Sequence, residues 1–363
     1  MKAAVMRAFH APLQLEDIDI AAPGPREVLV RTVATGVCHS DLHVIEAGLP
    51  VPPPLVLGHE PAGIVEAVGS EVTHCAPGDH VIGCLSAFCG NCEFCLSGKP
   101  NLCGGAATMR KPGEKPRLAK GAEAINQFAH LSSFAEKMLV HENAVVKIRK
   151  DMPLDRAALI GCGVTTGLGA ALNTAQVRAG STCVVIGCGG VGLAAIQGCR
   201  IAGESRIIAV DTMPWKLELA KTLGATDGVN AKETDAVMGV HGLVPGGVDY
   251  AFECIGTKQT AAQTVAMVKK GGAAVLVGVI PIGQTVDIPG LDIVISGKKI
   301  LGSMMGDNRF RLDMPRYVDF YLSGQLKLDE MISARLPLAE VNHAFEEMKK
   351  GSAARSVIVF DAA

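Results

Sequence analysis

Residues 181–192 read S-T-C-V-V-I-G-C-G-G-V-G. The apolar run up to residue 186 is typical of a buried parallel strand, and residues 193–202 (L-A-A-I-Q-G-C-R-I-A) have helical character. Glycines between a strand and a helix allow a tight turn and let the backbone approach a pyrophosphate at the helix N-terminus. The stretch therefore predicts a dinucleotide site formed by Gly187, Gly189, Gly190, Val191 and Gly192.

A second apolar run, I-I-A-V (207–210), ends at Asp211, nineteen residues after Gly192. A carboxylate in this position accepts hydrogen bonds from both hydroxyls of an adenine ribose and repels a 2′-phosphate. Asp211 therefore predicts NAD rather than NADP as the dinucleotide.

Strand-like and helix-like segments continue to alternate after this point, which predicts a Rossmann-type, doubly wound parallel sheet. These segments are 216–225, 248–254, 260–268 and 273–279. The flanking sequence differs, because V-L-V-R-T-V-A (28–34) is strand-like and no long helical pattern accompanies it. We expect an α/β protein with a β-rich catalytic domain at 1–163, an NAD-binding domain at 164–304 and a return to the catalytic domain at 305–363.

Two stretches of the first domain carry local expectations. Residues 104–136 are rich in Gly and then in Lys and Arg, so we expect a long loop with a solvated basic face, lining the substrate entrance. The segment D-M-P-L-D-R-A-A-L (151–159) predicts a short helix with Asp151 as its N-cap and Pro153 in its first turn.

The pattern C-x2-C-x2-C-x7-C covers Cys89, Cys92, Cys95 and Cys103. Four thiolates at this spacing complete a tetrahedral zinc shell and leave no open position, which is typical of a structural site. Disulfides are an alternative, but the chain begins M-K-A-A-V-M with no apolar signal segment, so an oxidising compartment is not expected. An iron-sulfur cluster is the other alternative.

A second metal site is predicted from Cys38 and His59, with Cys162 of G-C-G as the third ligand. Three protein ligands leave a fourth position for water or substrate, which is the arrangement of a catalytic zinc. We expect Asp41 to orient the imidazole of His59, and Glu60 to hydrogen-bond behind the metal or to serve as an alternative ligand. Each of these residues taken singly is equally compatible with an ordinary core position.

The segment G-H-E-P-A-G-I-V-E-A-V-G-S-E-V (58–72) resembles the signature of the zinc-containing alcohol dehydrogenases of the medium-chain dehydrogenase/reductase superfamily. C-H-S-D-L-H (38–43) and the four-cysteine segment flank it in the order of that family. The resemblance covers essentially the whole chain. It implies a first domain with the GroES-like fold, two zinc ions per subunit, and reversible oxidation of primary aliphatic, allylic or benzylic alcohols to aldehydes with NAD.

The resemblance also implies roles for residues outside the metal motifs. Ser40, the cofactor ribose and His43 would in turn carry the hydroxyl proton of the alcohol to solvent. Contacts to the cofactor are implied for His39, Lys216, Gly278, Val279 and Arg355. The length of 104–136 resembles the liver-type branch, which implies a homodimer.

The composition excludes several other classes of protein. The 363-residue chain has a formal net charge of −2, which gives no field to attract nucleic acid or an acidic membrane. No apolar run reaches the length of about 18 residues expected of a membrane helix. We therefore expect a cytoplasmic enzyme for small alcohols, with neither nucleic acid nor membrane as a partner.

Three alternatives remain open on the sequence. The NAD can be held so tightly that it never leaves, as in a nicotinoprotein that uses another acceptor. In the S-hydroxymethylglutathione (formaldehyde) branch, acidic residues follow the relay and an arginine follows the fourth structural cysteine. Here those positions read Glu46-Ala47-Gly48 and Gly104-Gly105-Ala106-Ala107, which disfavours that branch. A non-enzymatic binding protein is disfavoured because no zinc ligand is missing and Ser40 is present.

Overall fold

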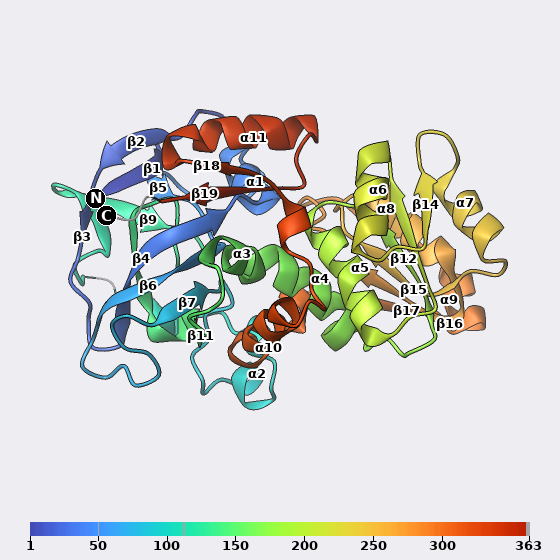
Figure 1. Cartoon of the computed structure of the whole chain (residues 1–363), viewed down its shortest axis with the longest axis horizontal. Helices are drawn as coiled ribbons and strands as arrows, with labels where there is room; N and C mark the ends of the chain where they lie inside the picture. The colour runs from blue at the N-terminus through green and yellow to red at the C-terminus, as the bar shows by residue number, and fades with distance from the viewer. Residues whose placement is uncertain (50, 112, 361–363) are drawn as a thin grey trace. The chain divides into compact units, whose positions relative to one another are not determined.

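The computed structural model describes the chain except for residues 50, 112 and 361–363. It folds as two compact units (Figure 1). The first unit comprises Met1–Cys162 and Arg309–Ala363, and the second comprises Gly163–Asn308. The chain therefore leaves the first unit and returns to it.

The second unit contains a six-stranded sheet with the order β14-β13-β12-β15-β16-β17. All its neighbouring strands are parallel, which confirms the predicted α/β class with a doubly wound sheet. Its strands are β12 (Thr182–Ile186), β13 (Arg206–Asp211), β14 (Asp227–Asn230), β15 (Val248–Glu253), β16 (Val268–Leu276) and β17 (Lys299–Gly302).

Helices connect these strands and pack in pairs against the sheet. α5 packs on α6, and α7 packs on α8. One hydrophobic core joins side chains of α7 and α8 to Val184 and Ile208 of the sheet. The helices are α4 (Thr165–Gly169), α5 (Gly190–Ala202), α6 (Pro214–Leu223), α7 (Ala236–Leu243), α8 (Lys258–Met267) and α9 (Gly290–Ser296).

The first unit is rich in strands, as its sequence predicts. One sheet has the order β11-β7-β6-β4-β19-β18, with β10 also paired to β4, and the other has the order β2-β1-β5-β9-β8-β3. The strands are β1 (Lys2–Met6), β2 (Gln14–Asp17), β3 (Asp19–Ile20), β4 (Glu27–Gly36), β5 (Leu55–Val56), β6 (Pro61–Val68), β7 (His80–Gly83), β8 (Leu118–Lys120), β9 (Glu123–Gln127), β10 (Lys137–His141), β11 (Val145–Ile148), β18 (Ile332–Leu336) and β19 (Arg355–Val359).

The C-terminal segment completes the first unit. β19 pairs antiparallel with β4, so that Val357 lies opposite Gly36, and Figure 1 shows the red strand beside the blue one. Phe345 of α11 (Val341–Lys350) packs in the same core as Leu42 of α1 (His39–Ile45). The remaining helices of this unit are α2 (Glu93–Leu96), α3 (Leu154–Leu159) and α10 (Phe310–Leu322).

The expectation of a long loop at 104–136 is wrong for its middle part. β8 and β9 form an antiparallel hairpin there, and β9 pairs with β5. The basic residues are not only a solvated face, because Arg117 is buried and its Nε lies 2.7 Å from Glu27. Arg110 also binds Glu27, with 2.5 Å between Nη2 and Oε2. These ion pairs anchor the segment to β4.

The predicted helix at 151–159 begins later than expected. α3 starts at Leu154, and its N-cap is Pro153, which has an extended backbone and makes no side-chain cap. The carboxylate of Asp151 instead pairs with Arg149 at 2.6 Å. The expected N-cap role of Asp151 is therefore wrong, because a nearby guanidinium binds its carboxylate.

The expectation that no apolar segment is long enough to cross a membrane is also not met. The helical segment Leu154–Thr174 has 21 residues and a mean hydropathy of 1.3 in its most apolar window, which suffices by length and composition. Within the structure, 83% of that window is buried, as for the core helix of a globular protein. The segment includes two π-helical turns, Ile160–Val164 and Ala170–Thr174. Such turns are frequent at functional sites.

Candidate metal centres and cofactor site

Four buried side chains of the first unit bring their donor atoms together. The atoms of Cys38, His59, Glu60 and Cys162 all lie within 4.8 Å of one another. Cys38 is the N-cap of α1, His59 and Glu60 directly precede β6, and Cys162 lies in the π-helical turn. The four residues are 0–6% exposed, so water is largely excluded around the donors.

Two glycines allow the backbone to form this site. Gly58 has φ +90°, and a Cβ there would lie 2.6 Å from the amide nitrogen of Phe134. A Cβ at Gly161 would lie 3.0 Å from the carbonyl oxygen of Gly83 and 3.2 Å from the Cα of Glu60, so a side chain there would crowd the π-helical turn. The backbone beside His59 and Cys162 therefore depends on residues with no side chain.

The imidazole of His59 is fixed on one side and open on the other. Its Nδ1 lies 3.1 Å from Oδ1 of Asp41, and that oxygen also accepts the amide of Gly58 at 2.9 Å. The ring of Phe128 meets it edge-on at 5.5 Å. The Nε2 atom is buried and has no hydrogen-bond partner among the described residues. A neutral imidazole whose Nδ1 donates to a carboxylate presents the Nε2 lone pair, which fits a metal.

The charges around this cluster suit a cation. Burial opposes protonation of His59, but the negative charges of Asp41 and Cys38 outweigh it and raise its pKa to about 10. The hydrogen bond from Cys162 holds the pKa of the Cys38 thiol well below its usual range, against the effect of burial. Two sulfurs and one imidazole nitrogen are a donor set that zinc prefers.

Glu60 is held from behind by Arg355. The guanidinium of Arg355 pairs with Oε2 of Glu60, and both side chains are almost completely buried. A Cβ at Gly36 would overlap the Glu60 carboxylate, so glycine on β4 makes room for the pair. The sequence did not reveal this pair, because Arg355 and Glu60 lie 295 residues apart.

The four cysteines of the C-x2-C-x2-C-x7-C segment form a second donor cluster. All four sulfurs lie within 4.8 Å of one another, and the Sγ atoms of Cys92 and Cys95 are 3.5 Å apart. The hydrogen bond from the amide of Asn91 is the main cause that lowers the pKa of Cys89 to about 6, although this residue is partly exposed. Burial and the neighbouring sulfurs raise the pKa of Cys95 to about 12, a conflict of charge that a bound cation removes.

The glycine-rich loop lies between β12 and α5, as predicted. Gly187 has φ +92°, and a Cβ at Gly192 would overlap the carbonyl of Gly187. At Gly189, the N-cap of α5, a Cβ would meet nothing within 4 Å, so the space outside the loop is open to a ligand. The carboxylate of Asp211 accepts the amide of Cys188 at 2.8 Å, which joins the end of β13 to the loop.

The other predicted residues occupy varied surroundings. Ser40 Oγ lies 3.9 Å from Cys38 Sγ, and His43 follows three residues later on α1. The ammonium of Lys216 lies 5.6 Å from the centre of the Trp215 ring. Three further cofactor contacts are predicted. His39 is exposed and is the first residue of α1, and Gly278 and Val279 follow the end of β16.

Comparison with known proteins agrees with this geometry. Residues 24–150 match the alcohol dehydrogenase GroES-like domain, and residues 190–323 match the zinc-binding dehydrogenase family. The chain is 42% identical to the class-3 alcohol dehydrogenase of Drosophila melanogaster, covering 99% of this chain and 97% of that protein. The chain belongs to the zinc-containing medium-chain alcohol dehydrogenases. This family membership confirms the resemblance inferred from the sequence, including the GroES-like domain.

Two further members of the family are informative. A Schizosaccharomyces pombe protein named probable S-(hydroxymethyl)glutathione dehydrogenase 1 is 40% identical over 98% of this chain and 96% of its own length. The crystal structure of benzyl alcohol dehydrogenase from Acinetobacter calcoaceticus has 36% identity and a TM-score of 0.94, covering 99% of both chains. The protein is therefore a zinc-dependent alcohol dehydrogenase, and enzymes of this class act on small alcohols.

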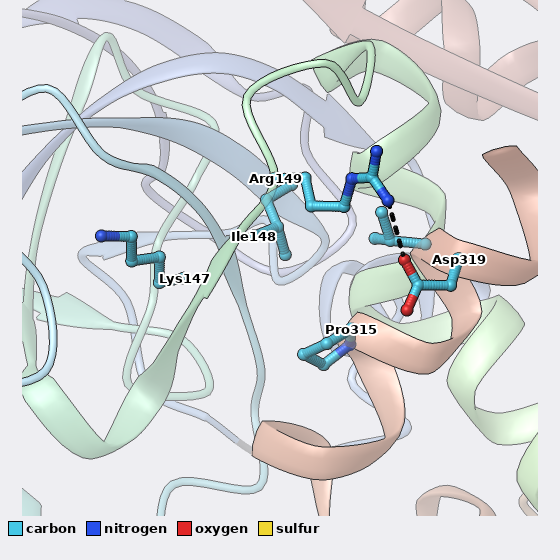
Figure 2. A pocket seen from close by; sticks show the side chains of 6 residues that line it. Lys147, Ile148, Arg149, Pro315 and Asp319 are labelled. Atoms are coloured by element: carbon cyan, nitrogen blue, oxygen red, sulfur yellow. Dashed lines mark hydrogen bonds and ion pairs between the residues drawn. The ribbon is translucent and has the colours of Figure 1, made fainter.

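A surface pocket of the first unit does not contribute to these sites. It has a volume of about 310 Å³ and lies between the end of β11 and α10 (Figure 2). Its lining is Lys147, Ile148, Arg149, Pro315, Val318 and Asp319, none of which belongs to a donor cluster of this alcohol dehydrogenase. Arg149 and Asp319 face each other across it at 3.4 Å, so its charges compensate one another.

Proposed function

We propose that this alcohol dehydrogenase oxidises primary aliphatic, allylic or benzylic alcohols to aldehydes, reversibly and with NAD as hydride acceptor. The observation that carries the proposal is the buried group of Cys38, His59 and Cys162, in which His59 Nε2 has no partner among the described residues. Three such donors and an open position are the arrangement of catalytic zinc sites.

The two donor clusters take different zinc ions. Cys38, His59 and Cys162 hold the catalytic ion, which when bound polarises a substrate oxygen and lowers the pKa of an alcohol. Asp41 orients His59 through Nδ1, and Glu60, tied to Arg355, supports the site from behind. The four thiolates of the second cluster hold a structural ion and leave it no open position.

The hydroxyl proton leaves through residues of α1. Ser40 accepts this proton at Oγ, close to the Cys38 sulfur, while it releases its own hydroxyl proton, and His43 passes the released proton to solvent. His43 suits this last step because it is partly exposed and lies one helical turn further along α1. Both groups can return the proton when an aldehyde is reduced.

The dinucleotide is NAD, which supplies the hydride-accepting nicotinamide. Its pyrophosphate binds at the glycine-rich loop, where the N-terminus of α5 favours negative charge. Asp211 binds the adenine ribose and repels a 2′-phosphate, which disfavours NADP. Further contacts come from His39, Lys216, Gly278, Val279 and Arg355.

The relatives support a second candidate, the oxidation of S-(hydroxymethyl)glutathione, because one of them bears that name at 40% identity. The local residues argue against it, since glutathione adducts carry carboxylates that need a cation. Gly104-Gly105-Ala106-Ala107 follows the fourth structural cysteine and offers none. The next two arginines, Arg110 and Arg117, are both bound to Glu27. Simple alcohols therefore remain the first candidate, as the benzyl alcohol dehydrogenase suggests.

The second unit also supports the proposal of a homodimer. β17 lies at the edge of the six-stranded sheet and, among the described strands, pairs only with β16. α9 precedes β17 in the chain, and its Leu291, Val294 and Ile295 are 69–79% exposed. An unpaired strand edge with exposed apolar side chains is typical of a surface covered by another chain. Light scattering of the wild type and of Val294→Asp tests this, with a smaller mass expected for the variant.

The test of function is NADH formation by the zinc-replete enzyme with excess NAD and a panel of short, allylic and benzylic alcohols. Turnover with these alcohols supports the proposal, whereas turnover only with formaldehyde and glutathione supports the second candidate. An NADH absorbance that appears once per subunit without added NAD identifies a nicotinoprotein. No reduction of NAD with any of these substrates contradicts the proposal and leaves a binding protein.

A further inference from the structure

A third group of potential metal ligands lies in the second unit. Cys183, Cys199 and Glu204 bring two thiol sulfurs and a carboxylate oxygen within 4.8 Å of one another. Both cysteines are completely buried, and Glu204 is partly buried. None of the three belongs to the proposed zinc sites or to the glycine-rich loop.

The alternation of β12 places Cys183 on a defined face of the sheet. Val184 and Ile186 pack in the hydrophobic core that includes α7 and α8. Because side chains alternate along a strand, Cys183 faces the opposite side, where α5 packs on β12. Cys199 belongs to the last turn of α5. The two thiols therefore meet between a strand and a helix that the fold holds together.

The turn after α5 fixes Glu204 beside the thiols. α5 ends at Ala202, and its C-cap Gly203 has φ +90°, which turns the chain back. The amide of Gly180 donates to the carbonyl of Gly203 at 2.8 Å, and the amide of Ser205 donates to Ser181 at 3.0 Å. The backbone on both sides of Glu204 is thus tied to the start of β12.

The carboxylate of Glu204 lacks a hydrogen-bond or ion-pair partner among the described residues. Both its oxygens are buried without a hydrogen-bond partner, and no ion pair with it occurs in the described part of the chain. Burial raises the pKa of Glu204 to about 7. A buried carboxylate normally binds a donor or a cation. The catalytic cluster likewise contains a buried ligand atom without a hydrogen-bond partner among the described residues, Nε2 of His59.

We infer that Cys183, Cys199 and Glu204 form a third metal site, which binds a thiophilic divalent cation such as Zn²⁺. Thiolate and carboxylate are both zinc ligands, and the sulfurs around a tetrahedral zinc lie about 3.8 Å apart, within the observed limit. On binding, each thiol releases a proton to solvent and no electron is transferred. The ion joins β12 to α5 and stabilises the second unit, independently of alcohol oxidation.

The primary experiment compares zinc content. The wild type, Glu204→Gln and Cys199→Ala are produced in zinc-supplemented culture, so that the buried site can fill during folding. They are then equilibrated under reducing conditions with free zinc at about 10 μM, in the range that saturates many protein metal sites. Metal analysis and native mass spectrometry give the zinc ions per subunit. Cys75→Ala is the matched control, because Cys75 is also buried but belongs to no three-donor group among the described residues.

We expect Glu204→Gln and Cys199→Ala to bind one zinc fewer per subunit than the wild type and the Cys75→Ala control. Equal zinc content in Glu204→Gln and the wild type overturns the inference, and it does so even if Cys199→Ala fails to fold. The result is the difference in zinc content between each variant and the wild type, so it does not depend on which alcohol is the substrate. Glu204→Gln should retain the wild-type rate of NAD reduction.

A second measurement identifies the ligands. Cadmium substituted for zinc should give one NMR resonance in the wild type that is missing from Glu204→Gln, at a shift between those of all-sulfur and all-oxygen sites. An intact mass lower by two hydrogens, with Cys183 and Cys199 joined in one peptide, shows a disulfide instead and overturns the metal site.

Discussion

The two metal clusters of the first unit contain similar ligands but are built in opposite ways. The four-cysteine cluster comes from one segment of 15 residues (89–103), is partly exposed and is surrounded largely by its own backbone amides. The cluster of Cys38, His59 and Cys162 draws on three distant segments and is buried. The first can form locally, whereas the second needs the whole unit to fold. The local four-cysteine cluster therefore suits a structural zinc ion, and the buried cluster suits a catalytic one.

The largest effect that separates the clusters is expected for Cys162→Ala. Loss of one of three ligands should remove the catalytic zinc and with it several kcal/mol of transition-state stabilisation, which lowers kcat/KM about a thousandfold or more. Steady-state kinetics and metal analysis test this. About one zinc per subunit should remain in the four-cysteine cluster. Activity equal to the wild type would mean that Cys162 is not a ligand.

Cys103→Ala should show the opposite pattern. The structural zinc is lost, and the free energy of unfolding should fall by about 4 kcal/mol, the linkage expected for a ligand present at a thousand times its Kd. Thermal unfolding and metal content measure the effect. Below the new Tm, kcat should stay within a few-fold of the wild type, because the four cysteines and the catalytic donors form separate groups of ligands. A loss of kcat as large as in Cys162→Ala contradicts the division of roles.

Asp41→Asn tests the contact between a carboxylate and a ligand imidazole, which occurs in the buried cluster but not in the four-cysteine cluster. Asp41 is completely buried and binds His59 Nδ1, so its loss should lower the affinity of the catalytic site for zinc about 10–100-fold. Competition with a zinc chelator measures this affinity. Asn91→Ala is the control at the other cluster, where the contact to sulfur comes from the backbone amide and survives the change. An equal loss of zinc in Asp41→Asn and Asn91→Ala would show that side-chain support is no more important at the buried cluster than at the four-cysteine cluster.

The smallest effect concerns the acidity of Cys89 in zinc-free protein. Its folded pKa of about 6 lies below the ordinary value of 9.0 because nearby amides stabilise the thiolate. The Cys89 thiolate therefore contributes to the stability of the folded zinc-free protein. This contribution is fully present above pH 9 and is lost as the pH falls through 6. Alkylation of Cys89, followed by mass spectrometry, should therefore have a midpoint near pH 6. Zinc should protect it, and a midpoint near 9 would show that the amides have no effect.

The sequence predicted the family and the fold class because both rest on short, local patterns. The glycine-rich loop with Asp211, and the cysteines at C-x2-C-x2-C-x7-C, each lie within about thirty residues and have a direct physical meaning. Errors arose where the interpretation of a segment overlooked a charged partner that competes for the side chain. Asp151 was expected to cap a helix but binds Arg149, and the basic part of 104–136 was expected in solvent although Arg117 and Arg110 bind Glu27.

The metal and dinucleotide ligands of this alcohol dehydrogenase can be recognised in its sequence, because zinc and dinucleotide motifs depend on residue type and spacing. Which distant groups meet depends on how the chain folds. Arg355 reaches Glu60 because β19 pairs with β4 and Gly36 leaves room for the ion pair. Cys183 and Cys199 meet Glu204 because β12 packs on α5. Spacing along the chain carries no signal of these contacts, since they arise from strand pairing and packing between elements.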